Sequence, residues 1–160
     1  MKKIVFAFVV SFSMFFTMLS ADVSAALPKE MAAEPEIIYE DEDIIVECQT
    51  IVYELDAMIQ PFATKKTISA AKVAKIKNGL GTLLATYTLS GTFTFDGTSS
   101  ACTAASYSSS IAESYCSFSS RSASKSGNKA YGSYTLYNSS SGKSYSGSLT
   151  ITCSKSGTVS

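Results

Sequence analysis

Side chains that could do acid–base or nucleophilic chemistry are few in this chain of 160 residues. The chain contains no histidine, which is the commonest general base and metal ligand. Between residues 82 and 160 the only carboxylates are Asp96 and Glu113. Two carboxylates are the minimum for glycoside hydrolysis, but an aspartate before Gly97 is expected for turn formation alone. No nucleophile-elbow, P-loop, zincin or Rossmann motif occurs. We therefore expect a protein that is not an enzyme and uses no cofactor or metal.

The four cysteines suggest cross-links rather than a metal site. An even number of cysteines in an exported chain favours disulfides, and no CxxC or Cys/His cluster points to zinc. Cys102 follows the first turn of the predicted β-domain and Cys153 ends its last strand, so we predict that these two pair. Closing that loop of about fifty residues would stabilise the fold by roughly 4 kcal/mol. Cys48 and Cys116 form the second predicted pair, although Cys48 could equally stay free or link two chains.

Three tyrosines stand among small hydroxyl residues and are the candidate binding surface: Tyr107, Tyr131 and Tyr137. Tyrosine among serines supplies contact area at low entropic cost. This pattern predicts binding to an extracellular partner, whether carbohydrate, cell wall or protein, and not to nucleic acid. The alternative is that the tyrosines pack against one another or cap strand edges.

The clearest periodic element lies at residues 83–95, LLATYTLSGTFTF. Leu83, Ala85, Tyr87, Leu89, Phe93 and Phe95 alternate with threonine and serine, which predicts a half-buried β-strand. Asp96-Gly97 then signals a turn. This strand should open the folded domain and supply the largest share of its core.

The remainder of the chain is rich in serine, with 23 serines among residues 98–160. Aromatic and aliphatic residues nevertheless recur at alternate positions between turn signals. The pattern predicts strands near residues 101–110, 113–124, 130–137 and 144–153, joined by turns at 125–129 and 138–143. Residues 82–160 should thus form a mainly β domain, a small antiparallel sandwich or barrel-like meander of four to six strands.

An acidic segment, residues 26–62, precedes this domain. Apolar residues between 44 and 59 fall on one arc of a helical wheel behind the acidic run 40–43, and Pro61 ends the pattern. We predict an amphipathic helix over residues 43–60, although the β-branched residues leave a strand as a competitor. The helix could dock on the β-domain, or act as a removable pro-segment or partner-binding helix. A cation site at residues 40–43 lacks the EF-hand spacing and glycine.

A basic linker is predicted at residues 63–81, since its apolar residues scatter around a helical wheel with lysines between them and Asn78-Gly79 is a stop signal. Charge is segregated along the chain: residues 27–60 hold ten acidic residues and one lysine, whereas residues 61–160 hold ten basic residues and two acidic ones. The two parts should attract one another or meet different partners, unless both are simply solvated.

The first 25 residues have the grammar of a cleaved signal peptide. Lys2 and Lys3 precede an apolar run at residues 4–19, and small residues follow up to Ala26. Cleavage is expected after Ala25 or Ala26, in a bacterial style of export. We therefore expect an extracellular protein with no membrane span after cleavage.

Residues 81–108, 110–133 and 148–160 resemble a small secreted family of Gram-positive bacteria that carries a domain of unknown function. The resemblance rests on the Thr/Ser-rich first strand, the SASKSGNKA turn and the positions of Cys102 and Cys153. It covers about half of the chain and implies no activity.

These observations lead to one leading expectation about function, a secreted non-enzymatic β-domain that acts as a binding or surface-interaction module. The alternative is a secreted antimicrobial or toxin-like precursor, in which the acidic segment shields the basic remainder.

Overall fold

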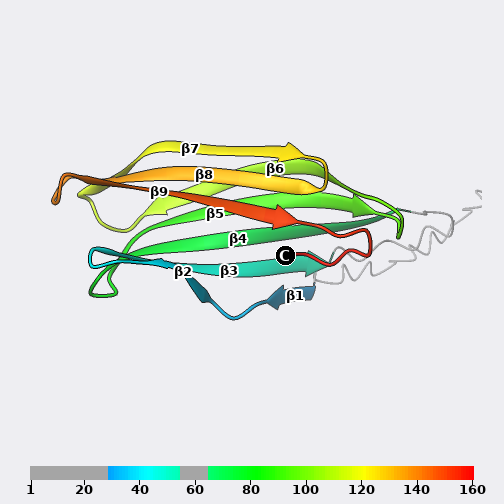
Figure 1. Ribbon diagram of the computed structural model, residues 1–160, viewed down its shortest axis with the longest axis horizontal. Coiled ribbons are helices and arrows are strands. Elements are labelled where there is room, and N and C mark those ends of the chain that lie inside the picture. Colours follow the sequence, from blue (N-terminus) through cyan, green and yellow to red (C-terminus); the bar gives the residue numbers. More distant parts are fainter. Residues whose placement is uncertain (1–28, 55–64) are drawn as a thin grey trace, which may run out of the picture.

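A computed structural model describes residues 29–54 and 65–160, and it folds them into two antiparallel β-sheets that face each other (Figure 1). The predicted signal peptide lies outside the described residues. No helix in the described part of the chain is long and apolar enough to span a membrane. The predicted mainly β, sandwich-like class is confirmed, and the two sheets do not close into a barrel.

The larger sheet has six strands: β1 (Lys29–Ala32), β2 (Glu36–Glu40), β3 (Ile44–Glu54), β4 (Lys66–Asn78), β5 (Leu83–Phe95) and β6 (Ser100–Ile111). Their order is β1-β3-β4-β5-β6. β2 pairs with the first half of β3 and β1 with its second half, so these two short strands share one edge of the sheet.

The smaller sheet consists of β7 (Cys116–Ser126), β8 (Lys129–Asn138) and β9 (Lys143–Thr152), in that order. It covers the inner face of the larger sheet, with β9 above β4 and β5 and β8 above β5 and β6. β6 leads directly into β7, which closes one side of the sandwich. On the opposite side no described strand joins β9 to the pair β2–β3, and we call this the open side of the sandwich (Figure 1).

The core is centred on β5, whose bounds match the predicted strand. Tyr87, Leu89 and Phe93 are fully buried, and they face buried residues of the smaller sheet such as Leu136 and Ile151. One inward residue differs from the prediction, because a bulge between Ile76 and Lys77 shifts the register at the start of β5. Leu84 is therefore buried in place of Leu83.

The predicted helix at residues 43–60 is wrong over its described part, since residues 44–54 form the strand β3. Ile44, Val46 and Cys48 point into the core at every second position, and β-branched residues pack well on a pleated sheet. On the helical wheel Val46 lay away from the apolar arc, whereas in the structure it is buried. Residues 55–60 lie outside the described part.

The predicted basic linker at residues 63–81 is also wrong, because residues 66–78 form β4, an interior strand of the larger sheet. Ile68, Ala70, Ala74 and Ile76 are buried on its inner face. Asn78–Gly81 is not a domain boundary but the turn of the β4–β5 hairpin: Asn78 Oδ1 accepts hydrogen bonds from the N–H groups of Leu80 and Thr82.

The segregated charges meet across the pairing of β3 with β4. Glu47 lies opposite Lys75, and its carboxylate forms an ion pair of 2.5 Å with Lys77. Such a partly exposed pair adds only about 0.2–1 kcal/mol to stability. Its greater effect is to favour this pairing over one that would place like charges opposite each other.

Candidate functional site

The three candidate tyrosines do not form one surface. Tyr131 and Tyr137 both lie on β8 and project from the outer face of the smaller sheet, each with 38% of its surface exposed. Tyr107 lies on β6 instead, where its ring stacks on the buried Tyr87 with a centroid distance of 5.9 Å and an interplanar angle of 19°. Tyr107 thus contacts a core residue and is still 43% exposed, and only the two β8 tyrosines share a face.

The outer face of the smaller sheet is a regular grid of hydroxyl groups, which we call the hydroxyl face. Antiparallel register places one residue of each strand side by side in four successive rows. The rows are Ser117–Tyr137–Ser144, Ser120–Thr135–Ser146, Ser122–Ser133–Ser148 and Ser124–Tyr131–Thr150. Every member carries a hydroxyl and none carries a charge. Lys129 first appears in the next row, at the β7–β8 turn.

The geometry of the sheet fixes the spacing of these hydroxyls. Neighbouring strands lie about 4.8 Å apart, and residues on one face repeat about every 6.7 Å along a strand. Cross-strand hydrogen bonds hold part of the grid in place, at 2.8 Å between the hydroxyls of Ser122 and Ser133 and 2.9 Å between those of Thr135 and Ser146. Almost all twelve side chains are exposed, and the remainder are half-buried. The face can donate and accept hydrogen bonds in a fixed two-dimensional pattern.

A second feature is a cleft of about 340 Å³ on the open side of the sandwich, which we call the inter-sheet cleft. Apolar residues of β3 and β4 line it from below, and the start of β9 borders it from the smaller sheet. Its lining comprises Ile38, Tyr39, Ile44, Val46, Ile76, Tyr134 and residues 144–148. This volume lies within the range of small-molecule and peptide side-chain pockets.

Tyr134 reaches the cleft by crossing β9 at Gly147. A Cβ atom at Gly147 would lie 2.4 Å from the Tyr134 ring and hydroxyl, so only glycine leaves room for this side chain. Only 4% of Tyr134 is exposed, and burial raises the pKa of its phenol to about 12. The phenol therefore stays neutral and can act as a hydrogen-bond donor at the wall of the cleft.

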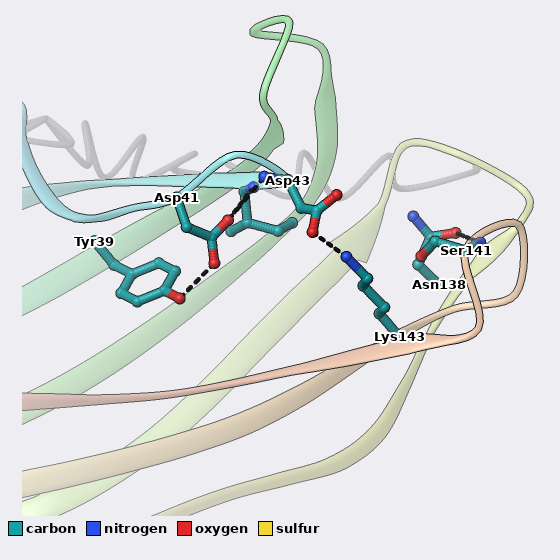
Figure 2. Close-up of polar contacts among 7 residues, drawn as sticks. Tyr39, Asp41, Asp43, Asn138, Ser141 and Lys143 are labelled. Atoms are coloured by element: carbon teal, nitrogen blue, oxygen red, sulfur yellow. Dashed lines mark hydrogen bonds and ion pairs between the residues drawn. The ribbon is translucent and has the colours of Figure 1, made fainter.

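Figure 2 shows two acidic residues of the β2–β3 turn, Asp41 beside Tyr39 of the cleft lining and Asp43 opposite Lys143. Asp41 accepts a hydrogen bond of 2.5 Å from the Tyr39 hydroxyl and two more from the N–H groups of Asp43 and Ile44. These bonds hold the pKa of the Asp41 carboxyl below its usual range. Lys143, from the β8–β9 turn, forms an ion pair with Asp43 across the open side, and this contact raises the pKa of the lysine.

The β2–β3 turn does not form the cation site that was considered for residues 40–43. Asp41 Oδ1 already organises the turn through backbone N–H groups, as an aspartate commonly does. Across residues 29–54 and 65–160, no three acidic, cysteine or histidine side chains are grouped so that they could hold a metal ion. Asp96 has the expected turn role: Oδ1 accepts hydrogen bonds from the N–H groups of Thr98 and Ser99, and the pKa of its carboxyl is strongly lowered.

All four cysteines are free thiols in the structure, so neither predicted disulfide is present. Each is buried and behaves as a small apolar side chain of the core. Burial raises the pKa of Cys48 and Cys116, which lie within β3 and at the start of β7. Cys48 and Cys116 were predicted to pair because they remained after Cys102 and Cys153. The structure places them on β3 and β7, which belong to different sheets.

Cys102 and Cys153 are nevertheless neighbours of one turn. The N–H of Cys102 donates to the carbonyl of Gly127, and the N–H of Cys153 donates to the carbonyl of Asn128. The β7–β8 turn thus fixes the ends of β6 and β9 beside each other. The prediction was correct in bringing these two residues to one place, and wrong about the covalent bond.

Sequence reasoning missed the inter-sheet cleft altogether. Its walls come from the presumed helix, the presumed linker and the last strand, and these can be combined only once β3 and β4 are known to be strands. The run SYSGS at residues 144–148 held one signal, since glycine in a strand often marks a close approach of another group.

Comparison with known proteins adds no further likeness: no family model matches the sequence, and no match is found among curated proteins or solved structures. The resemblance to a secreted Gram-positive family stays a prediction. The hydroxyl face and the inter-sheet cleft are therefore the two features of the described residues that can support a function.

Proposed function

We propose that the protein is a secreted, non-enzymatic binding module whose hydroxyl face engages a neutral polysaccharide outside the cell. The observation that carries this proposal is the uncharged grid of twelve hydroxyls in four registered rows. A polymer with hydroxyl groups along its length can exchange hydrogen bonds with such a grid at many points. Because the four rows hold no charge, an anionic polymer gains no ion pair there.

Tyr131 and Tyr137 complete the surface. They stand in the first and last rows of the central strand, with Ser133 and Thr135 between them. A tyrosine ring offers a rigid apolar area together with a hydroxyl, which suits the mixed apolar and polar faces of a sugar ring. The two tyrosine rings, with the hydroxyls of Ser133 and Thr135 between them, can hold one polysaccharide chain along β8.

Cosedimentation with insoluble cellulose, chitin and purified peptidoglycan tests this proposal. At least one of these polymers should retain the protein, and raising the salt to about 1 M should leave binding intact because no exposed ion pair is involved. Tyr131→Ala and Tyr137→Ala should each weaken binding about tenfold, equivalent to about 1.4 kcal/mol.

A matched pair of variants at the centre of the face sharpens the test. Ser133→Glu places a charge in the third row and should abolish retention, whereas Ser133→Thr keeps the hydroxyl and should bind as the parent does. The proposal is contradicted if no polymer retains the protein, or if the glutamate variant is retained as strongly as the parent. Retention that protease treatment of the peptidoglycan removes would also contradict it, since it would assign the face to a protein ligand.

A further inference from the structure

We infer that the free edge of β9, inside the inter-sheet cleft, is a site where an extended peptide of a partner protein adds to the smaller sheet as a further strand. This inference does not depend on polysaccharide binding, because it uses the backbone edge and the interior of the sandwich rather than the hydroxyl face. Strand addition is a common mode of peptide recognition, in which main-chain hydrogen bonds give affinity and alternate side chains give specificity.

The hydrogen bonds at the end of β9 show which of its backbone groups face away from β8. Thr152 exchanges two backbone hydrogen bonds with Ser160, at 2.8 and 3.0 Å, on the side opposite β8. The carbonyl of Thr150 accepts a hydrogen bond of 3.1 Å from Lys72, which lies on the larger sheet. Both residues therefore direct their N–H and C=O groups outward.

The same direction follows for the start of the strand. In an antiparallel strand every second residue points its backbone groups to the same side, and the β8–β9 register runs without a bulge. Ser144, Ser146 and Ser148 must then direct six backbone groups towards the inter-sheet cleft, which these residues line. Within the described residues no backbone group pairs with them on that side.

The chain itself already pairs with this edge, through an isolated bridge between Cys153 and Val159 that the two Thr152–Ser160 hydrogen bonds make. Ser160 and its neighbours lie along the far end of β9 and close it, and Val159 packs against the core there. Lys72 caps the next carbonyl. A partner peptide would continue the same edge over residues 144–148, so the tail and the peptide would occupy successive parts of one strand.

The cleft also defines the side chains that the peptide should carry. Alternate side chains of an added strand would enter the cleft above Ile44, Val46 and Ile76, which are at most 6% exposed. There they would also meet Ile38 and Tyr39, the apolar lining residues that are about half exposed. The peptide side chains should therefore be aliphatic. Asp41 and Asp43 of the β2–β3 turn lie beside Tyr39 and Lys143 at one end of the cleft, where Lys143 pairs with Asp43. A basic residue at that end of the peptide would balance this charge.

Amide hydrogen exchange of the ¹⁵N-labelled protein tests the inference with the synthetic hexapeptide Lys-Val-Thr-Val-Thr-Val. The Ser146 and Ser148 amides should exchange freely in the protein alone and at least tenfold more slowly with saturating peptide. The Tyr145 and Gly147 amides, which are directed at β8, should not change. The control peptide Lys-Thr-Thr-Val-Val-Val has the same composition without the alternation, and it should protect neither serine amide.

Two variants separate the backbone of Ser146 from its side chain. Ser146→Pro removes an N–H that faces the cleft, so it breaks no ladder bond, and proline is tolerated on edge strands in this orientation. It should weaken peptide binding at least tenfold, whereas Ser146→Ala should bind as the parent does. A hexapeptide that is N-methylated at alternate residues gives the same test without altering the protein, and it should not bind.

Three results would overturn the inference. The first is equal binding of the peptide to the parent and to Ser146→Pro, and the second is undiminished binding of the N-methylated peptide. The third is protection of Ser146 and Ser148 that rises with protein concentration in the absence of peptide, because it would assign the edge to a second copy of this chain.

Discussion

At the scale of single residues, contact between the sheets depends on tyrosines that cross over glycines. Tyr87 rises from β5, and its hydroxyl donates a hydrogen bond of 2.6 Å to the carbonyl of Ser122 on β7. On the way it passes Gly132 on β8, where a Cβ atom would lie 2.6 Å from the Tyr87 hydroxyl. The smaller sheet can approach β5 because this position has no side chain.

Gly132→Ala should therefore destabilise the protein by about 1–3 kcal/mol, the usual cost of overpacking a core. The cost should be smaller when Tyr87→Phe is already present, because the phenylalanine lacks the closest atom. Urea denaturation of both single variants and the double variant measures the coupling. Equal costs of Gly132→Ala in the two backgrounds would show that the Tyr87 hydroxyl is not what excludes a side chain here.

The raised pKa of Tyr134 links stability to pH. Its phenol has a pKa of about 12 in the folded protein, against about 10 in the unfolded chain. The unfolded chain thus loses this proton first, so the free energy of unfolding should fall as the pH rises from about 10 to about 12. Burial also raises the pKa of Tyr87 and Cys48. Comparison of the parent with Tyr134→Phe isolates the contribution of the Tyr134 phenol. Chemical denaturation should show a smaller fall in the free energy of unfolding for the variant across this pH range.

At the scale of elements, β3 is the segment where a strand and a helix would bury different residues. Val46 is 6% exposed and faces the core, while its neighbour Ile45 is only half-buried, on the outer face of the larger sheet. On a helix Ile45 would have been the buried residue of the two. A pair of aspartate substitutions can therefore decide between the two structures.

Val46→Asp should cost several kcal/mol, because it buries a charge without a partner. Ile45→Asp should cost about 1 kcal/mol or less, as expected for a site that water reaches. Thermal unfolding followed by circular dichroism compares them. A larger loss of stability for Ile45→Asp would mean that the strand is oriented the other way.

Strands of the second half of the chain could be predicted because their sequences combine alternation with clear turns. β5 has the predicted bounds, and β8 and β9 differ from prediction by one residue at each end. β4 could not be predicted in this way because its inner face includes Lys72, whose stem crosses the core side and whose ammonium group reaches the carbonyl of Thr150. A lysine on an inner face interrupts the apolar alternation that identifies a strand. The structure explains its position, because the carbonyl of Thr150 at the edge of β9 accepts a hydrogen bond from Lys72.

The functional surfaces were predictable to different degrees. Tyr131 and Tyr137 were correctly placed on an exposed face of one strand. The grid around them depends on the register of three strands, and the inter-sheet cleft on contacts between residues about a hundred positions apart, such as Asp43 and Lys143. Neither register nor long-range contact follows from the local pattern of one strand.

At the scale of the whole molecule, the acidic and basic parts form one folding unit with the residues that follow. β3 and β4 supply Ile44, Val46, Ile68 and Ile76 to the same core cluster as β5 and β8. A fragment of residues 82–160 would leave this half of the core without cover and expose the edge of β5.

We therefore expect the fragment 82–160 to be unfolded or aggregated, although it contains the five strands predicted as a separate domain. Circular dichroism and the dispersion of amide proton resonances measure this directly, with residues 29–160 as the control. A well-dispersed spectrum of the fragment would restore the domain boundary at the Asn78–Gly81 turn. It would also favour the precursor hypothesis, since the acidic part could then be removed without loss of structure.

The order of the strands has a consequence for how the chain acquires its fold. Within β3–β6 and within β7–β9, strands that are consecutive in sequence pair with each other. Each such ladder can form from a local hairpin, and contacts between nearby residues shorten the search that limits the folding rate. The step that joins distant residues is the docking of the three-stranded sheet on the six-stranded one. The chain could therefore build both sheets first, and the closure of the sandwich, in which Tyr87 reaches across to β7, would come last.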